Sequence, residues 1–142
     1  MKIYISTEQP EFEDYTHVSN IMNLDGEVLD CEATDIVVKN LLSEVSDNET
    51  ETLLTKILSK LRLNGTITIV DKDIDIIYMK YDRGDIDLQT LNASIFNGVS
   101  KKSFLNMEKV TEIIKDKIKI EQSSIDSQNG NFILKARRVA NA

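Results

Sequence analysis

The sequence predicts one α/β domain over residues 1–142, built on a mostly parallel sheet that ends in an antiparallel hairpin. The length of 142 residues is typical of a single domain with a core of its own. The composition, with 41% hydrophobic and 29% charged residues, 5 Gly and 1 Pro, is that of an ordinary globular protein. Short β-branched runs alternate with amphipathic helical stretches, which is the order of elements that α/β folds share.

Two short strands are predicted near the N-terminus. Ile3 and Ile5 alternate with polar residues, which indicates a strand over residues 2–6, and a second strand is expected over residues 15–21. Only about nine residues separate Ser6 from Thr16, whereas parallel neighbours usually need a crossover of about a dozen residues or more. Either the first crossover helix is missing or these two strands pair in another way.

A βαβ unit is predicted in the middle of the chain. Residues 34–38 form a β-branched run suited to a strand that is buried on both faces. Ser46 and Glu49 have the spacing of a capping box, and Asn64-Gly65 provides a left-handed helix stop. Between them, apolar residues keep helical spacing at Leu53, Leu54, Ile57, Leu58 and Leu61. A second β-branched strand follows at once over residues 66–70.

The second half of the chain predicts helices and then a hairpin. One or more helices are expected within residues 74–97, and another near residues 107–117. Apolar and polar residues then alternate, and a turn at residues 128–131 separates two strands, so residues 117–138 are predicted to form a β-hairpin.

From about residue 27 to residue 138, the ordered pieces resemble the class I S-adenosylmethionine-dependent methyltransferases, in particular their short bacterial and phage members. Residues 32–42 resemble the fourth strand of that family, and residues 53–63 the helix beyond it. Residues 64–70 are similar to its Gly-Gly turn and fifth strand, with Asn64 in place of the first Gly. Residues 103–107 resemble the lead into its last helix, and residues 130–138 its closing strand. The resemblance implies a Rossmann-like methyltransferase fold.

The resemblance also implies a cofactor site, but its motifs are degenerate here. The family has a Gly-rich turn after the first strand, where this chain has Ser6 and Thr7 followed by Glu8. The acidic residue that ends the second strand is replaced by Ser19 or Asn20. An acidic residue that meets the adenine would be Asp30 or Glu32. The candidate cofactor-binding residues are therefore Ser6, Thr7, Ser19, Asp30, Glu32 and Lys39.

Asp71, Asp73 and Asp75 alternate as in the opening of a calcium loop, but Ile76 and Asp82 stand where the loop needs Gly and Glu. We therefore expect a polar loop followed by a helix cap, and no metal site.

The remaining reactive side chains favour structural roles. The chain has one His and one Cys, which excludes a disulfide and a Cys/His zinc site within one chain. His17 has no nucleophile that the sequence pairs with it, and Cys31 is flanked by acidic residues that disfavour a thiolate. Tyr78 and Tyr81 lie at helical spacing, where packing is a simpler role than lining an acceptor pocket.

Charge and hydropathy bound the partners and the compartment. The net charge of −7 disfavours binding to nucleic acid, because affinity for a polyanion comes mainly from Lys and Arg. No apolar run reaches about 18 residues, and no signal peptide is recognisable. We expect a soluble, cytoplasmic protein of a bacterium or of a phage-infected cell, or one associated with a virion, without membrane contact.

Two functions are compatible with these features. The first is a non-catalytic interaction or structural module, of a phage or another assembly, which binds a protein partner and no cofactor. The alternative is an active S-adenosylmethionine-dependent methyltransferase on a small-molecule, sugar or protein acceptor. A metal-dependent glycosyl or phosphoryl enzyme built on Asp71 and Asp73 is a third, weaker hypothesis. Side chains that close the strand ends near Ser6, Ser19 and Lys39 favour the first function, and a cavity of a few hundred Å³ there favours the second.

Overall fold

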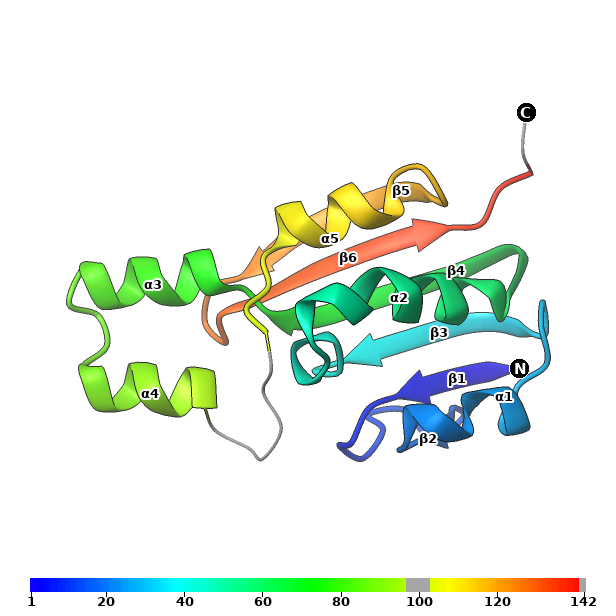
Figure 1. Cartoon of the computed structure of the whole chain (residues 1–142), viewed down its shortest axis with the longest axis horizontal. Helices are drawn as coiled ribbons and strands as arrows, with labels where there is room; N and C mark the ends of the chain where they lie inside the picture. Colours follow the sequence, from blue (N-terminus) through cyan, green and yellow to red (C-terminus); the bar gives the residue numbers. More distant parts are fainter. Residues whose placement is uncertain (97–102, 141–142) are drawn as a thin grey trace.

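A six-stranded sheet with the order β2-β1-β3-β4-β6-β5 forms the centre of the computed structural model, which describes residues 1–96 and 103–140 (Figure 1). The first four strands are parallel, and β6 and β5 are antiparallel to their neighbours. The strands are β1 (Lys2–Ile5), β2 (Thr16–Val18), β3 (Ala33–Lys39), β4 (Leu61–Lys72), β5 (Lys119–Asp126) and β6 (Asn131–Arg137). This confirms the predicted parallel sheet and C-terminal hairpin.

The connection from β1 to β2 contains no helix, as the short spacing predicted. Residues 6–15 form an irregular loop, and β2 nevertheless pairs in parallel with β1, so that Ile3 lies opposite Thr16. The second strand is shorter than the predicted 15–21, because the chain turns into the 3-10 helix η1 (Ile21–Asn23) and the short helix α1 (Leu24–Glu27). The sequence analysis did not predict these two elements.

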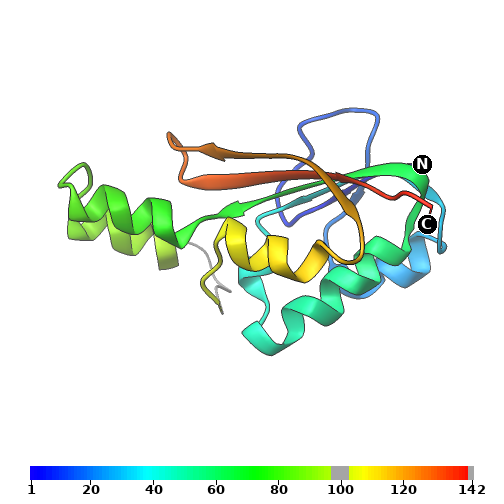
Figure 2. The ribbon, with the colours of Figure 1, turned by 90° about the horizontal axis from the view of Figure 1, so that it is seen from above.

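One face of the sheet is covered by α1, α2 (Thr50–Ser59) and α5 (Met107–Ile114) (Figure 2). Alternate residues of the strands point to these helices and form the core. The strand contribution consists of Ile3, Ile5, Val18, Ala33, Ile36, Val38, Leu61, Ile67, Ile69, Phe132, Leu134 and Ala136, all almost fully buried. Burial of this face supplies most of the hydrophobic stabilisation of the fold.

The predicted boundaries of the central helix are wrong at both ends. Residues 47–49 form the 3-10 helix η3, and the Ser46 hydroxyl donates to Asn48 Oδ1 instead of capping the helix. The helix ends at Ser59, and Leu61 pairs with Ala33 as the first residue of β4. Burial of Leu61 in the core favours the strand over another helical turn.

The Asn64-Gly65 pair lies inside β4, where the pairing with β3 is irregular, and does not stop a helix. Asn64 has a φ of 64°, and its backbone N–H donates to the Arg138 carbonyl oxygen at 2.7 Å. A Cβ on Gly65 would lie 2.8 Å from Leu61 Cδ1 and 2.9 Å from the Arg62 carbonyl oxygen. Gly65 is therefore required by close approach of the chain to itself.

The other face of the sheet, which we call the open face, is covered by no helix of the described residues (Figure 2). Within residues 1–96 and 103–140, the 6–15 loop is the one segment that lies over it. The prediction that residues 34–38 are buried on both faces is therefore confirmed only in part. Val37 points to the open face and is 9% exposed, whereas Asp35 on the same face is half-buried, and Ile36 packs against the helices. The alternation of Thr and Ile along β4 fits a strand with one uncovered face.

The helices predicted within residues 74–97 are α3 (Ile74–Asp82) and α4 (Leu88–Phe96). They project beyond the carboxyl ends of β3 and β4 as an arm (Figure 1). Residue 97, where the predicted helical region ends, lies outside the described residues. Tyr78 and Tyr81 are exposed on the arm, so the packing role predicted for them is wrong. The 3-10 helix η2 (Leu42–Glu44) completes the elements, and no described helix is long and apolar enough to cross a membrane.

Candidate functional site

The four parallel strands end at one edge of the sheet, on the side of α3 and α4 (Figure 1). Since β1 lies between β2 and β3, the order of strands reverses at β1. In open α/β sheets, ligands bind in the crevice outside the carboxyl ends of the strands at such a switch point. The residues that follow β1 and β3 therefore form the first candidate site.

Ser6 is buried at the end of β1, and its polar groups are already used. Its backbone N–H donates to the Val18 carbonyl oxygen at 3.3 Å, and its hydroxyl oxygen accepts from the Glu8 N–H at 3.1 Å. Thr7 is exposed. Because no helix follows the turn, no helix N-terminus points at the switch point from this connection.

Two acidic side chains of the 6–15 loop reach across to the end of β3. Asn40 Nδ2 donates to the Glu8 carboxylate at 3.1 Å, and Lys39 forms an ion pair with Glu11. Glu11 holds the pKa of Lys39 above its ordinary value. Asn40 has a φ of 55°, which an Asn tolerates better than most residues. These contacts bridge the space between the ends of β1 and β3.

Of the other predicted cofactor residues, the structure brings Ser19 to this edge but not Asp30 or Glu32. Ser19 follows β2 and is exposed beside the end of β1, since Ile5 pairs with Val18. Asp30 and Glu32 precede β3 and therefore lie at the opposite, amino-terminal edge of the sheet, about 20 Å away along a strand of this length. The Asp30 carboxylate pairs with Lys60 Nζ at 2.8 Å, and the Glu32 carboxylate accepts from the Leu29 N–H at 2.7 Å. These two residues have local structural roles.

His17 and Cys31 also have local partners. His17 Nε2 donates to the Ser6 carbonyl oxygen at 2.7 Å, and its ring meets the Tyr4 ring edge-on at a centroid distance of 6.2 Å. Cys31 is exposed, and Arg138 Nη1 lies 3.4 Å from its sulfur. Neither residue lies beside a second group that would make a catalytic pair in the described structure.

The aspartates after β4 organise the backbone. The Asp71 carboxylate is fully buried and accepts from the Ser43 N–H at 3.2 Å and the Lys72 N–H at 2.8 Å. Asp73 caps α3, as predicted, by accepting from the Asp75 N–H at 2.9 Å, and it also accepts from the Met107 N–H at 3.0 Å. Among residues 1–96 and 103–140, no three His, Cys, Asp or Glu side chains come together as metal ligands.

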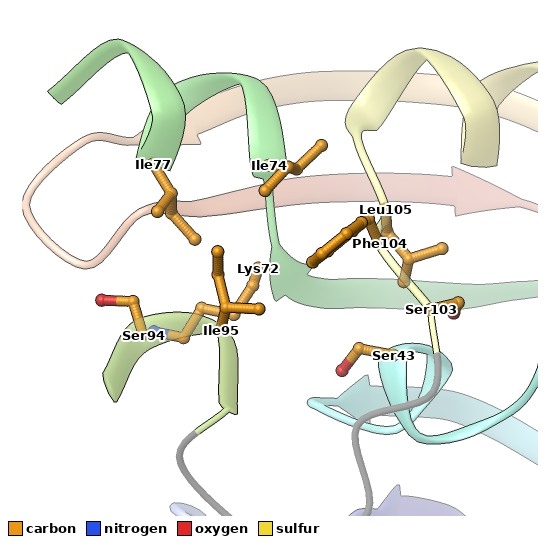
Figure 3. Close-up of a pocket in the computed structure, with 9 residues that line it drawn as sticks. All are labelled: Ser43, Lys72, Ile74, Ile77, Ser94, Ile95, Ser103, Phe104 and Leu105. Carbon is orange, nitrogen blue, oxygen red and sulfur yellow. The ribbon is translucent and has the colours of Figure 1, made fainter. Parts of the chain in front are cut away.

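A small cavity lies beside these aspartates, between the arm and the segment that leads into α5 (Figure 3). Its volume is about 20 Å³. A cavity of this size holds about one water molecule. Mostly apolar side chains line it: Ser43, Lys72, Ile74, Ile77, Ser94, Ile95, Ser103, Phe104 and Leu105.

A much larger hollow, of about 500 Å³, lies on the open face. Its floor consists of side chains from β1, β3, β4 and β6, and the 6–15 loop and the turn of the β5–β6 hairpin flank it. The lining residues are Tyr4, Glu11, Phe12, Tyr15, Asp35, Val37, Lys39, Thr68, Val70, Asp126, Asn129, Asn131, Ile133 and Lys135. Of the predicted cofactor residues, only Lys39 belongs to it.

Tyrosine hydroxyls are prominent in this hollow. The Tyr15 hydroxyl donates to the Asp35 carboxylate, and burial together with that negative charge raises the pKa of Tyr15 well above its ordinary value. Burial also raises the pKa of Tyr4. The Tyr4 hydroxyl and Asn131 Oδ1 are buried and have no hydrogen-bond partner in the described part of the chain.

Sequence reasoning missed this hollow, although a signal for it exists. Thr66 and Thr68 alternate with the core residues Ile67 and Ile69, which indicates that one face of a central parallel strand lacks a full apolar cover. The contact between Glu8 and Asn40 has no such signal, because 32 positions separate the two residues and a loop of irregular shape brings them together.

Comparison with known proteins decides the fold. No protein-family model and no curated protein sequence matches the chain. A SAM-dependent methyltransferase from Archaeoglobus fulgidus superposes with a TM-score of 0.59 over 88% of this chain and 68% of its own, at 12% identity. The chain has the fold of the class I S-adenosylmethionine-dependent methyltransferases.

Two further methyltransferase-fold neighbours agree. An O-methyltransferase family 2 protein from Planctomyces limnophilus, in complex with apigenin, has a TM-score of 0.53 and 20% identity, and covers 75% of this chain and 30% of its own. Magnesium protoporphyrin IX methyltransferase from Synechocystis PCC 6803, with SAH bound, has a TM-score of 0.55 and 11% identity, and covers 87% of this chain and 50% of its own. This chain therefore spans 30% to 68% of the length of these three methyltransferase-fold chains.

Proposed function

We propose that this chain is a methyltransferase-like domain that does not use S-adenosylmethionine and works by binding a protein partner. The observation that carries the proposal is the bridge from Glu8 to Asn40, which lies across the switch point between β1 and β3. In this fold the cofactor would have to pass through that space.

Chemistry at the end of β1 supports the proposal. The methionine part of the cofactor ends in a carboxylate, and a Gly-rich turn lets backbone N–H groups approach such a group without a Cβ in the way. Here the Ser6 N–H donates to Val18, and the next charged side chain is the anionic Glu8. A carboxylate beside a carboxylate is repelled, so the end of β1 does not fit the carboxylate of the cofactor.

The small volume of the cavity at the carboxyl edge of the sheet also supports the proposal. Sites for small molecules and cofactors usually have volumes of about 300 to 1,000 Å³. The cavity beside Ser43 and Lys72 has about 20 Å³, whereas the hollow of about 500 Å³ lies on the open face. The large concave surface therefore lies mainly on the open face, and it shares Glu11 and Lys39 with the contacts at the strand ends.

A second candidate function is S-adenosylmethionine-dependent methyl transfer, because the fold is that of methyltransferases and one neighbour holds SAH. For this function, Glu8 would have to release Asn40 and turn away from the switch point when the cofactor binds. A binding measurement separates the two candidates without knowledge of a methyl acceptor.

The test is thermal unfolding of the full chain with and without millimolar S-adenosylhomocysteine, together with the Glu8→Gln variant. A ligand at about 100 times its dissociation constant stabilises a fold by about 2.7 kcal/mol, which amounts to a shift of several degrees. The proposal expects no shift for the wild type. A shift for the wild type overturns it. A shift for Glu8→Gln alone supports it, because the charge of Glu8 then excludes the ligand.

A further inference from the structure

The open face leaves a mostly parallel sheet with helices on one side only. Such sheets are normally covered on both faces, because their strands otherwise expose apolar side chains to water. The apolar floor of the hollow is formed by Val37, Val70 and Ile133, of which Val70 and Ile133 are half-buried. At its rim, Phe12 is 48% exposed, although it is a large apolar side chain.

We propose that this hollow binds one amphipathic α-helix of a partner protein, with an apolar stripe flanked by acidic side chains. The proposal rests on the proposed function, in which the domain works through a protein partner, and it names the surface and the chemistry of that partner.

The width of the floor suits a single helix. From β1 to β6 the floor crosses three inter-strand steps of about 4.8 Å, which gives about 14 Å. A helix with its side chains is about 10 to 12 Å wide. The hollow is bounded by Phe12 and Tyr15 of the loop on one side and by Asp126 and Asn129 of the hairpin on the other. One helix therefore fits between these walls, whereas two do not.

Two buried polar atoms in the hollow need partners that a helix can bring. The Tyr4 hydroxyl and Asn131 Oδ1 belong to side chains that are more than nine-tenths buried, and both residues line the hollow. Buried polar groups in folded proteins almost always have hydrogen-bond partners. Donors such as Gln, Asn or Ser at the borders of the apolar stripe would satisfy them.

The charges of the hollow indicate the sign of the flanking residues. Lys39 is paired with Glu11, and Asp35 accepts from Tyr15. Asp126, the third acidic residue of the lining, accepts from Asn129 Nδ2 at 2.7 Å, so these groups already have partners. Lys135 is exposed on β6 and forms no ion pair within residues 1–96 and 103–140. An acidic side chain of the partner would pair with Lys135.

The experiment uses two designed helical peptides with the same stripe of Leu residues, flanked by Glu in one and by Lys in the other. Binding of each labelled peptide to the full chain is followed by fluorescence anisotropy. We expect the Glu peptide to bind the wild type at least tenfold more tightly than the Lys peptide. Lys135→Glu should reverse this preference, and it lies on the surface, so the variant should fold.

Two further variants locate the binding surface. Val70→Glu places a charge on the floor and should weaken binding of the Glu peptide more than tenfold. Phe96→Glu is the matched control, because Phe96 is 65% exposed but lies on the arm, and it should bind like the wild type. Equal unfolding temperatures of Val70→Glu and the wild type make the loss of binding interpretable.

Several results would overturn the proposal: no binding of either peptide, equal binding of both, or binding that Lys135→Glu leaves unchanged. Sedimentation equilibrium tests whether a second copy of this chain fills the hollow instead. A wild-type dimer that dissociates in the Val70→Glu variant would show that it does. Binding of S-adenosylhomocysteine is measured separately. Binding of S-adenosylhomocysteine would contradict the proposed function and leave the peptide result intact. If the peptides alone fail to bind, only the assignment of the hollow as the binding surface is contradicted.

Discussion

The two faces of the sheet differ in how their apolar side chains are covered. On the covered face, three helices bury alternate strand residues such as Ile36 and Ile67 completely. On the open face, the neighbouring residues Val37 and Val70 lie on the floor of a hollow, and the 6–15 loop is the one described segment that reaches over this face. The same strands therefore provide a stable core on one side and an unfilled surface on the other.

The cause of this difference lies in one connection. A crossover between parallel strands normally supplies a helix, which packs on the sheet. The ten or so residues between β1 and β2 are too few for this, and they form a loop held by Tyr15 and Glu11 on β3. Without a helix in this connection, the open face stays uncovered. The loop in its place puts acidic side chains over the switch point.

The largest expected effect comes from removing a side chain on the covered face. Ile67→Ala should lower the free energy of unfolding by about 2 to 5 kcal/mol, because Ile67 is fully buried and the cavity does not refill. Val70→Ala, three positions along the same strand but on the open face, should cost less than about 1 kcal/mol. Urea unfolding of both variants checks this, and equal losses would show that the open face is packed as a core.

A smaller effect is expected from removal of the Asp73 carboxylate, which caps α3 after the end of β4. Asp73→Ala removes the cap of α3 and the acceptor for the Met107 N–H, which should cost about 1 to 3 kcal/mol. Asp82→Ala, in the exposed last turn of the same helix, is the matched control and should change stability by less than about 0.5 kcal/mol. If Asp73→Ala were as mild as its control, the arm would not depend on this contact.

The smallest effect is a dependence on pH that belongs to the open face. A raised pKa means that folded Tyr15 keeps its proton more tightly than the unfolded chain does. This contribution to stability is complete below the unfolded pKa of about 10 and is lost as the pH rises toward the folded value. Unfolding temperatures should therefore fall between about pH 10 and pH 11.

Tyr15→Phe is the control for this pH dependence. It should show a shallower fall, although Tyr4 contributes in the same direction. Absorbance near 295 nm reports tyrosine ionisation in the same samples. A wild type and a Tyr15→Phe variant with identical pH profiles would contradict the assignment to Tyr15.

Much of the fold could be predicted from the sequence, because local patterns decide it. Ile3 and Ile5 give a strand by alternation, and the spacing of Leu54, Ile57 and Leu58 gives a helix. The end of that helix could not be predicted, because Leu61 joins β4 only through its pairing with Ala33, which is a tertiary contact.

The candidate site was less predictable than the fold. Asp30 and Glu32 were expected near the cofactor, but their position before β3 places them at the amino-terminal edge, where Lys60 binds Asp30. The partner of Glu8 depends on how a loop without regular structure folds over the sheet. Nothing in the local pattern of residues 6–15 specifies that path.

Two-dimensional ¹H–¹⁵N NMR tests most directly whether ligands bind at the strand ends or on the open face, because it maps the shift of each backbone amide. S-adenosylhomocysteine and the Glu-flanked peptide are added in separate titrations. We predict that the peptide moves the amides of Val37, Val70 and Ile133, and that S-adenosylhomocysteine leaves those of Ser6, Thr7 and Asn40 unchanged. Shifts of Ser6, Thr7 and Asn40 that saturate with S-adenosylhomocysteine would contradict the account.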